Sequence, residues 1–350
     1  MGVRALAGAA LLAALGLAAQ AEPLRIATYS PDLSRDGPGL LLRDLGREDA
    51  QIAAVVAVLA ETRPDILLLT DFDWDLDGRA LDAFAARLAE AGLDYPHRFA
   101  ARPNAGMATG LDLNADGRLG TADDAQGFGT FSGQGGMAIL SRHPIGPVTD
   151  DTDFLWRDLP GHLMPVLPEE VAAVRRLSST AHWDVVVTVA GSPLHLLAMS
   201  ATPPVFDGPE DLNGRRNHDE LAFWLHHLPE APFVLAGNLN MDPMDSEGRP
   251  EALAAIMAHV TDPRPRSAGG AAAKGGVNAG HKGDPALDTG DWPDDKPPGN
   301  LRVDYVLPAK GLTVQDSGVF WPADGPLAEA VLTASAHRLV WVDLDWPPAR

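Results

Sequence analysis

The chain of 350 residues contains no cysteine. It therefore forms no disulfide bonds, and a zinc site built on thiolates is excluded. Positive charge is also scarce, because 27 Lys and Arg residues stand against 48 Asp and Glu residues, a formal net charge of −21. Such a charge repels nucleic acid over most of the surface. We expect a small anionic ligand or a protein partner rather than nucleic acid, and acidity of this kind suits cation binding.

Long apolar runs are missing too, with one exception at the N-terminus. Arg4 precedes an Ala/Leu/Gly stretch over residues 5–18, and Ala19-Gln20-Ala21 has a small-x-small pattern. This order is typical of a secretory signal peptide. The alternative is a membrane anchor, but the run is short for a span of about 20 residues. We expect a signal peptide at residues 1–21, no membrane span after its cleavage, and a periplasmic or secreted protein.

Short apolar runs of strand length recur along the rest of the chain, and most are bounded by Gly, Pro, Asp or Ser. They are Leu24–Tyr29, Ile66–Leu69, Met137–Leu140, Val185–Val189, Leu194–Met199, Phe233–Ala236, Arg302–Leu307 and Leu339–Leu344. Between them, residues 52–59, 81–88 and 221–228 carry apolar residues at the i, i+3, i+4, i+7 spacing of a helix. This mixture predicts a layered α/β protein.

Three segments interrupt the pattern: residues 102–130, 147–172 and 263–300, which are rich in Gly, Asp, Pro or Ala. Loops of this length are usually functional or mobile. Strand-like runs resume after each of them, so we interpret them as insertions into one domain that covers residues 22–350.

Seven motifs in order resemble the endonuclease/exonuclease/phosphatase family, whose fold is DNase I-like, over about residues 24–345. They are Arg25–Ser30 (RIATYS), Pro64–Asp73 (PDILLLTDFD), Gly135–Ile145 (GGMAILSRHPI), Pro203–Glu220 (PPVFDGPEDLNGRRNHDE), Gly237–Asp242 (GNLNMD), Asn300–Leu307 (NLRVDYVL) and Ser335–Val340 (SAHRLV). The resemblance implies a four-layer α/β/β/α sandwich. Two sheets pack face to face with helices outside, and active-site residues lie on loops at one end.

The resemblance also implies a chemistry, the metal-dependent cleavage of phosphate esters. Carboxylates hold Mg²⁺ or Mn²⁺, an Asp activates water, and His residues contact phosphoryl oxygens or transfer protons. Of the family's positions this sequence keeps Asn240, Asp304 and His337. Asp304 and His337 form a plausible pair in which the acid orients the imidazole.

Five other family positions are substituted. The resemblance implies an Asn near the metal where this chain has Ser30, the metal-binding Glu where it has Asp71, and a His where it has Ser200. It also implies the water-activating Asp where the chain has Asn238, and the Asp before the last His where it has Ala336. An amide takes no proton from water near neutral pH, and losing one general acid or base costs about 10²–10⁴ in rate. The sequence predicts a degenerate, catalytically weak or inactive site that binds Mg²⁺ or Mn²⁺ poorly.

An alternative is an active phosphodiesterase or phosphatase with a rebuilt metal site. Its metal ligands would come from the acids near the strand ends, and it would use the His337–Asp304 pair. The candidate acids are Asp32, Asp73, Asp75 and Asp77. The competing interpretation is that these acids are solvated loop residues.

Residues 112–123 match the spacing of an EF-hand-type calcium loop. The five ligand positions are Asp112, Asn114, Asp116, Arg118 through its carbonyl, and Asp123. Gly117 permits the sharp turn. Asp123 stands in place of the usual Glu, and its shorter side chain reaches less far toward the ion. We expect Ca²⁺ to order residues 102–130. The alternative is that this Asp- and Gly-rich sequence forms a turn without an ion.

Arg215 and Arg216 are candidates for an anionic ligand, since guanidinium pairs with phosphate in a bidentate manner. The alternative is a structural role beside a helix that starts at Asn217–Glu220.

Overall fold

The strands of the computed structural model, which describes residues 23–346, form two sheets. The predicted signal peptide at residues 1–21 lies outside the described residues. One sheet has the order β10-β11-β1-β2-β4-β3 and the other β5-β6-β7-β8-β9. The first consists of β1 (Leu24–Tyr29), β2 (Ile66–Phe72), β3 (His97–Phe99), β4 (Gly136–Ser141), β10 (Val314–Val319) and β11 (Val340–Leu344). The second consists of β5 (Ile145–Asp150), β6 (His182–Val189), β7 (Ser192–Ser200), β8 (Phe233–Asn238) and β9 (Asp304–Pro308).

Both sheets are mixed, since β1 runs parallel to β2 and β7 runs parallel to β8, whereas the other pairs are antiparallel. Strands β1 and β2 contact β7, β8 and β9 across the interface between the sheets. All residues of β4, β8 and β9 are buried. Strands covered on both faces carry continuous apolar runs, which is why these segments stand out in the sequence.

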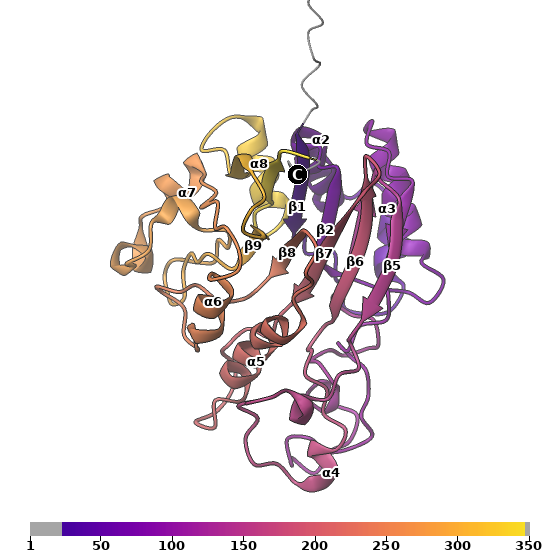
Figure 1. The fold of residues 1–350 in the computed structure, drawn as a ribbon, viewed down its shortest axis with the longest axis vertical. Helices are drawn as coiled ribbons and strands as arrows, with labels where there is room; N and C mark the ends of the chain where they lie inside the picture. The colour runs from indigo at the N-terminus through magenta and orange to yellow at the C-terminus, as the bar shows by residue number, and fades with distance from the viewer. Residues whose placement is uncertain (1–22, 347–350) are drawn as a thin grey trace, which may run out of the picture.

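The helices of the described residues are α1 (Leu40–Leu45), α2 (Ala50–Thr62), α3 (Arg79–Glu90), α4 (Glu169–Ala172), α5 (Leu212–His227), α6 (Glu251–Ile256), α7 (Ala268–Ala272) and α8 (Pro326–Ala334). Most of them lie beside the strands, whereas α4 lies below the strands among loops (Figure 1). Helix α2 packs against α8 and α3, while α5 packs against α6. In Figure 1, α3 lies to the right of the strands and α5 and α6 lie to the left. The predicted α/β sandwich is confirmed. No helix within residues 23–346 is long and apolar enough to cross a membrane.

Every apolar run that we predicted to be a strand overlaps one, but β3, β5 and β10 were missed. Their residues are half-buried or exposed for the most part, so they lack the apolar signal. Strand β5 overlaps the start of the predicted insertion 147–172. It lies at a sheet edge, and Pro147 falls within the register shift between Ile145 and Val148, where proline is tolerated. That insertion therefore begins after Asp150.

The insertion at residues 263–300 carries a buried carboxyl group at Asp288, of which only 6% is exposed. Burial, together with the charges of Asp242, Asp245 and Asp284, raises the pKa of Asp288 to about 7. A carboxyl whose pKa is raised by folding costs stability once it ionises. This cost is absent near pH 4, grows as the pH rises, and is complete above about pH 7.

We predict that Asp288→Asn stabilises the protein above pH 7, by up to about 3 kcal/mol in the free energy of unfolding, and has little effect near pH 4. Urea unfolding at both pH values measures this. Asp295→Asn, which removes the same charge from an exposed position of the insertion, serves as the control. Equal effects of the two substitutions at pH 8 would contradict the explanation.

Candidate active site

The family positions gather at one end of the two sheets. In the second sheet, Ser200 at the end of β7 pairs with Asn238 at the end of β8, and Asn238 pairs with Asp304 at the start of β9. In the first sheet, Ser30 follows β1 and Asp71 lies near the end of the parallel strand β2. The structure therefore brings these residues to the same edge, where the resemblance implies an active site.

Helix α5 fixes the ends of β7 and β8 through two buried polar residues. The Asn217 amide donates hydrogen bonds to the carbonyl oxygens of Thr202 (2.8 Å) and Leu239 (2.9 Å). The Glu220 carboxylate accepts the backbone N–H groups of Ser179 and Thr202, and burial raises its pKa. Unpaired backbone groups are costly inside a protein, so these bonds hold both strand ends in place.

The Asp304–His337 pair is present. His337 Nδ1 lies 2.8 Å from Asp304 Oδ2, and the Asp304 side chain is 0% exposed against 11% for His337. An ionised carboxylate only accepts, so Nδ1 carries the proton and Nε2 is left for proton transfer. Burial lowers the pKa of His337, but the carboxylate of Asp304 and those of Asp32 and Asp71 outweigh it, so the pKa is raised.

A neutral amide occupies the position of the water-activating acid. Asn238 is 7% exposed, and its Oδ1 accepts the backbone N–H of Asn240 at 2.9 Å. The Asn240 amide in turn donates to the carbonyl oxygen of Ala201 at 2.7 Å. Beside them, Ser200 is half-buried. None of these three side chains can accept a proton from water at neutral pH.

Three residues at this end have left-handed backbone conformations: Asp32 (φ 51°), Asp71 (φ 51°) and Asn240 (φ 49°). At Asp71 the register between β2 and β4 also shifts between Leu69 and Phe72. Asp and Asn tolerate this region better than other residues with a side chain, yet each such conformation costs energy. Strained residues of this kind collect at functional sites, which supports the assignment.

Asp71 and Asp32 form a pair of half-buried carboxylates. Burial, followed by the charges of Asp32 and Asp73, raises the pKa of Asp71 to about 6. Asp32 Oδ2 accepts the backbone N–H of Ala336 at 3.0 Å. A carboxylate thus lies against the backbone of the position where the family carries an Asp.

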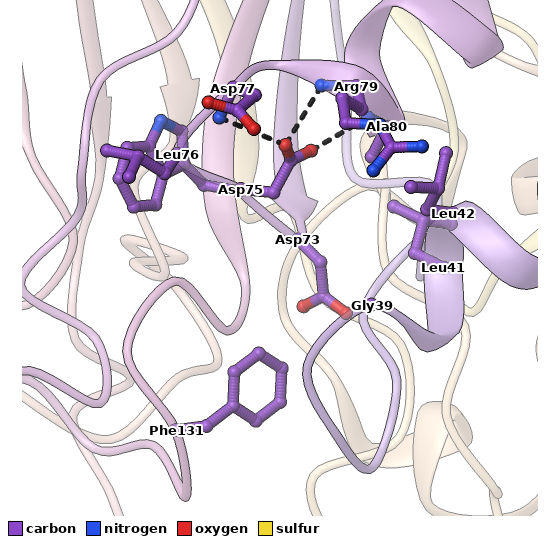
Figure 2. Close-up of a pocket in the computed structure, with 11 residues that line it drawn as sticks. Gly39, Leu41, Leu42, Asp73, Asp75, Leu76, Asp77, Arg79, Ala80 and Phe131 are labelled. Carbon is purple, nitrogen blue, oxygen red and sulfur yellow. Dashed lines mark hydrogen bonds between the residues drawn. The ribbon is translucent and has the colours of Figure 1, made fainter.

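Asp75 and Asp77 do not contribute to this pair. Figure 2 shows the Asp75 carboxylate at the first turn of α3, where it accepts the backbone N–H groups of Asp77 (3.2 Å), Arg79 (2.9 Å) and Ala80 (2.7 Å). Asp75 is therefore a helix-capping residue. Asp77 is exposed. Both line a separate pocket of about 210 Å³ that Phe131 borders.

Asp73 also has a structural role. Its carboxylate accepts hydrogen bonds from Ser34 Oγ (3.0 Å) and from the backbone N–H groups of Arg35 (2.9 Å) and Gly135 (3.1 Å). Of the four acids that could rebuild a metal site, Asp32 and Asp73 both act on the charge of Asp71, but the Asp73 carboxylate is taken up by these three hydrogen bonds.

The donor set does not reproduce the metal site implied by the resemblance. Across residues 23–346, no group of three or more His, Asp or Glu side chains is arranged to hold a metal ion. Asp32 and Asp71 remain, and Mg²⁺ is usually held by one or two carboxylates plus substrate phosphates. Two carboxylates that are not joined by a third His, Asp or Glu ligand among the described residues fit a weak site.

Arg215 and Arg216 tie loops together. Arg216 is 4% exposed and donates to carbonyl oxygens that include those of Leu177 (2.8 Å) and Gln126 (2.6 Å). Arg215 donates to the carbonyl oxygens of Glu210 and Leu163. The Arg216 guanidinium is therefore engaged inside the protein, whereas Arg215 is half-buried and its candidate role stays a prediction. The predicted helix start at Asn217–Glu220 is wrong, because α5 begins at Leu212 and Asn217 lies inside it.

The candidate calcium loop forms a tight turn. Asp112 accepts the N–H groups of Asp116 (3.1 Å) and Gly117 (2.9 Å), Asn114 accepts that of Asp116 (3.2 Å), and Asp116 accepts that of Arg118 (2.8 Å). Gly117 has φ 82°, which explains the glycine at this position.

The predicted ligand Asp123 has an acidic neighbour, Asp124, whose side chain also bonds within the loop. The Asp124 carboxylate is buried and accepts the N–H groups of Leu113 (2.8 Å) and Thr121 (3.1 Å). Asp123 lies beside it in the short 3-10 helix Ala122–Asp124 and is exposed. Two adjacent acids in the sequence were the signal that could have suggested a role for Asp124.

The third insertion also reaches the site, which the sequence analysis missed. Trp292 packs against the His337 ring, with ring centroids 5.3 Å apart. No motif or spacing in residues 263–300 indicates this contact.

Two mixed sheets with a polar cluster at one end define a layered α/β sandwich of the phosphoesterase class. A sequence profile described as the Endonuclease/Exonuclease/phosphatase family matches residues 36–337, and the chain belongs to this family.

Solved structures agree with this assignment of the fold. An endonuclease/exonuclease/phosphatase from Beutenbergia cavernae is similar with a TM-score of 0.55 and 22% identity, over 92% of this chain and 71% of that one. An endonuclease/exonuclease/phosphatase family protein from Leptotrichia buccalis is similar with a TM-score of 0.51 and 15% identity, over 92% of this chain and 99% of that one. A 3'-5' exonuclease from Neisseria meningitidis is similar with a TM-score of 0.50 and 17% identity, over 92% of this chain and 100% of that one. No curated protein sequence matches the chain.

We predict that Asp304→Asn lowers the pKa of His337 by about one unit or more, because the charge that stabilises the imidazolium is removed while the shape is kept. NMR titration of the His337 Hε1 resonance measures the change. Asp324→Asn, at an exposed position, should leave that pKa in place. An unchanged titration in Asp304→Asn would show that the pair does not control the imidazole.

Proposed function

We propose that this protein is an exported, DNase I-like protein whose metal-dependent phosphoesterase site is degenerate and catalytically weak or inactive. The observation that carries the proposal is the Asn238 carboxamide, which lies between Ser200 and Asp304 in the strand register. The cleft would retain a small anionic phosphoester or a protein partner. Export to the periplasm or the medium rests on the apolar run after Arg4.

The chemistry supports weak activity because several groups are lost together. Removing one general acid or base typically costs about 10²–10⁴ in rate. The positions of Ser200 and Asn238 have both lost their titratable group. Such effects do not add when residues act as a unit. The remaining Asp304–His337 pair would orient a phosphoryl group, but the position that activates water holds the Asn238 amide.

A second candidate is an active metal-dependent phosphodiesterase or phosphatase. It is favoured by one observation, the approach of the Asp32 carboxylate to the Ala336 N–H at 3.0 Å beside Asp71. If these two carboxylates hold Mg²⁺ or Mn²⁺, the metal would neutralise phosphate charge. His337 and Asp304 would then supply proton transfer.

Assaying the mature chain on a phosphodiester and a phosphomonoester, with Mg²⁺, Mn²⁺ or Ca²⁺, separates the two candidates. We expect a rate that stays at the level of the His337→Ala variant under all conditions, since Asn238 offers no carboxylate to activate water. Parent activity that disappears both in His337→Ala and in Asp32→Asn would sink the degenerate-site proposal and establish the second candidate.

The loop at residues 112–123 is proposed to bind Ca²⁺. Its carboxylates turn toward backbone N–H groups in the pattern of a tight turn, and a cation would offset their mutual repulsion. After chelator treatment, Ca²⁺ should raise the melting temperature of the parent but not of a double variant, Asp112→Asn with Asp116→Asn. A parent melting temperature that does not respond to Ca²⁺ would count against the site.

A further inference from the structure

A short segment of the third insertion, Thr289–Trp292, lies directly against the Asp304–His337 pair. The indole of Trp292 meets the His337 imidazole at an interplanar angle of 87°, with centroids 5.3 Å apart. This edge-to-face arrangement is one that aromatic rings prefer. Trp292 is half-buried while the His337 side chain is 11% exposed, so the indole covers part of the imidazole.

The backbone of this segment is fastened to the residues around the pair. Gly290 forms a β-bridge with His337, and the Asp291 N–H donates to the Ala336 carbonyl oxygen at 2.8 Å. The Asp304 N–H donates to Thr289 Oγ1 at 2.9 Å. These bonds leave the segment little freedom to move away from the pair.

An ion pair completes the attachment. The Asp291 carboxylate pairs with the Arg338 guanidinium, and Arg338 also donates its backbone N–H to the Thr289 carbonyl oxygen at 2.7 Å. Arg338 is 1% exposed, so the ion pair is shielded from water on its side. Such a pair holds its partners more firmly than one at the surface.

Gly290 explains how the indole reaches its position. A Cβ atom at Gly290 would lie 2.3 Å from Cζ3 of the Trp292 ring. The indole therefore folds back over its own backbone, and only glycine leaves room for it. A methyl group at Gly290 would displace the ring without removing it.

We propose that Trp292 is a specificity-determining residue. By covering His337, it restricts the cleft to a ligand with one small, accessible phosphoryl group and excludes phosphodiesters with bulky groups on both sides. The size limit rests on the proposed anion-binding cleft. The cover itself does not depend on whether the Asp304–His337 pair catalyses or only binds.

The test compares the parent with Trp292→Ala, Trp292→Phe and Gly290→Ala. Calorimetry measures the affinities for inorganic phosphate and for bis(p-nitrophenyl) phosphate, each with Mn²⁺. In Trp292→Ala and Gly290→Ala, the affinity for the bulky ester relative to phosphate should rise by at least about tenfold, the scale of one relieved steric contact in a binding site. Trp292→Phe should stay near the parent ratio.

Chemical modification tests the cover independently of any ligand. Diethyl pyrocarbonate at pH 8, followed by peptide mass spectrometry, should modify His337 severalfold faster in Trp292→Ala and Gly290→Ala than in the parent. Trypsin cleavage at Lys274 and Lys282, both in the insertion and each followed by Gly, reports whether the insertion has unfolded instead.

An unchanged affinity ratio, or binding of neither anion to any variant, would overturn the size limit. An unchanged modification rate would overturn the cover. Faster modification that is matched by faster trypsin cleavage would also overturn the proposal, because loss of the whole insertion would then explain it. Phosphoester hydrolysis by the parent would contradict the degenerate-site proposal alone. The affinity ratio and the modification rate of the variants would still test the role of Trp292.

Discussion

The register of β7, β8 and β9 is the constraint on which this end of the molecule depends. It sets Ser200, Asn238 and Asp304 side by side at one edge, and Asp304 in turn holds His337. A slip of one residue in any of these strands would turn its side chain to the opposite face. The buried polar contacts of α5 guard against such a slip, because Asn217 and Glu220 bond to the backbone just beyond the strand ends.

The proposed function rests on a scaffold that is kept while several of its reactive side chains are replaced. The strand ends, the left-handed conformations at Asp71 and Asn240 and the Asp304–His337 pair are all in place. The group that would activate water is an amide held by hydrogen bonds to its neighbours. Under the proposed function, folding still maintains a strained, partly buried site whose remaining groups suit binding and orientation better than proton abstraction. The cover of Trp292 over His337 fits this emphasis on fixed geometry.

The sequence predicted the sandwich and its buried strands because those strands are covered on both faces and are continuously apolar. It missed β3, β5 and β10, since edge strands and half-exposed strands have no such signal. The order of motifs located Ser200, Asn238, Asp304 and His337. The uses of Asp75 as a helix cap, of Arg216 as a tie between loops and of Trp292 as a cover depend on contacts between distant segments. Neither local spacing nor composition encodes such contacts.

The most direct test of the account is the phosphodiesterase rate of a variant that restores the family residues at Ser30→Asn, Asp71→Glu, Ser200→His, Asn238→Asp and Ala336→Asp. If the scaffold is intact and only the chemistry is missing, this variant should exceed the parent by at least about 10² in kcat/KM with Mg²⁺ or Mn²⁺. A folded restored variant no faster than the parent would show that the substituted side chains are not what limits the site.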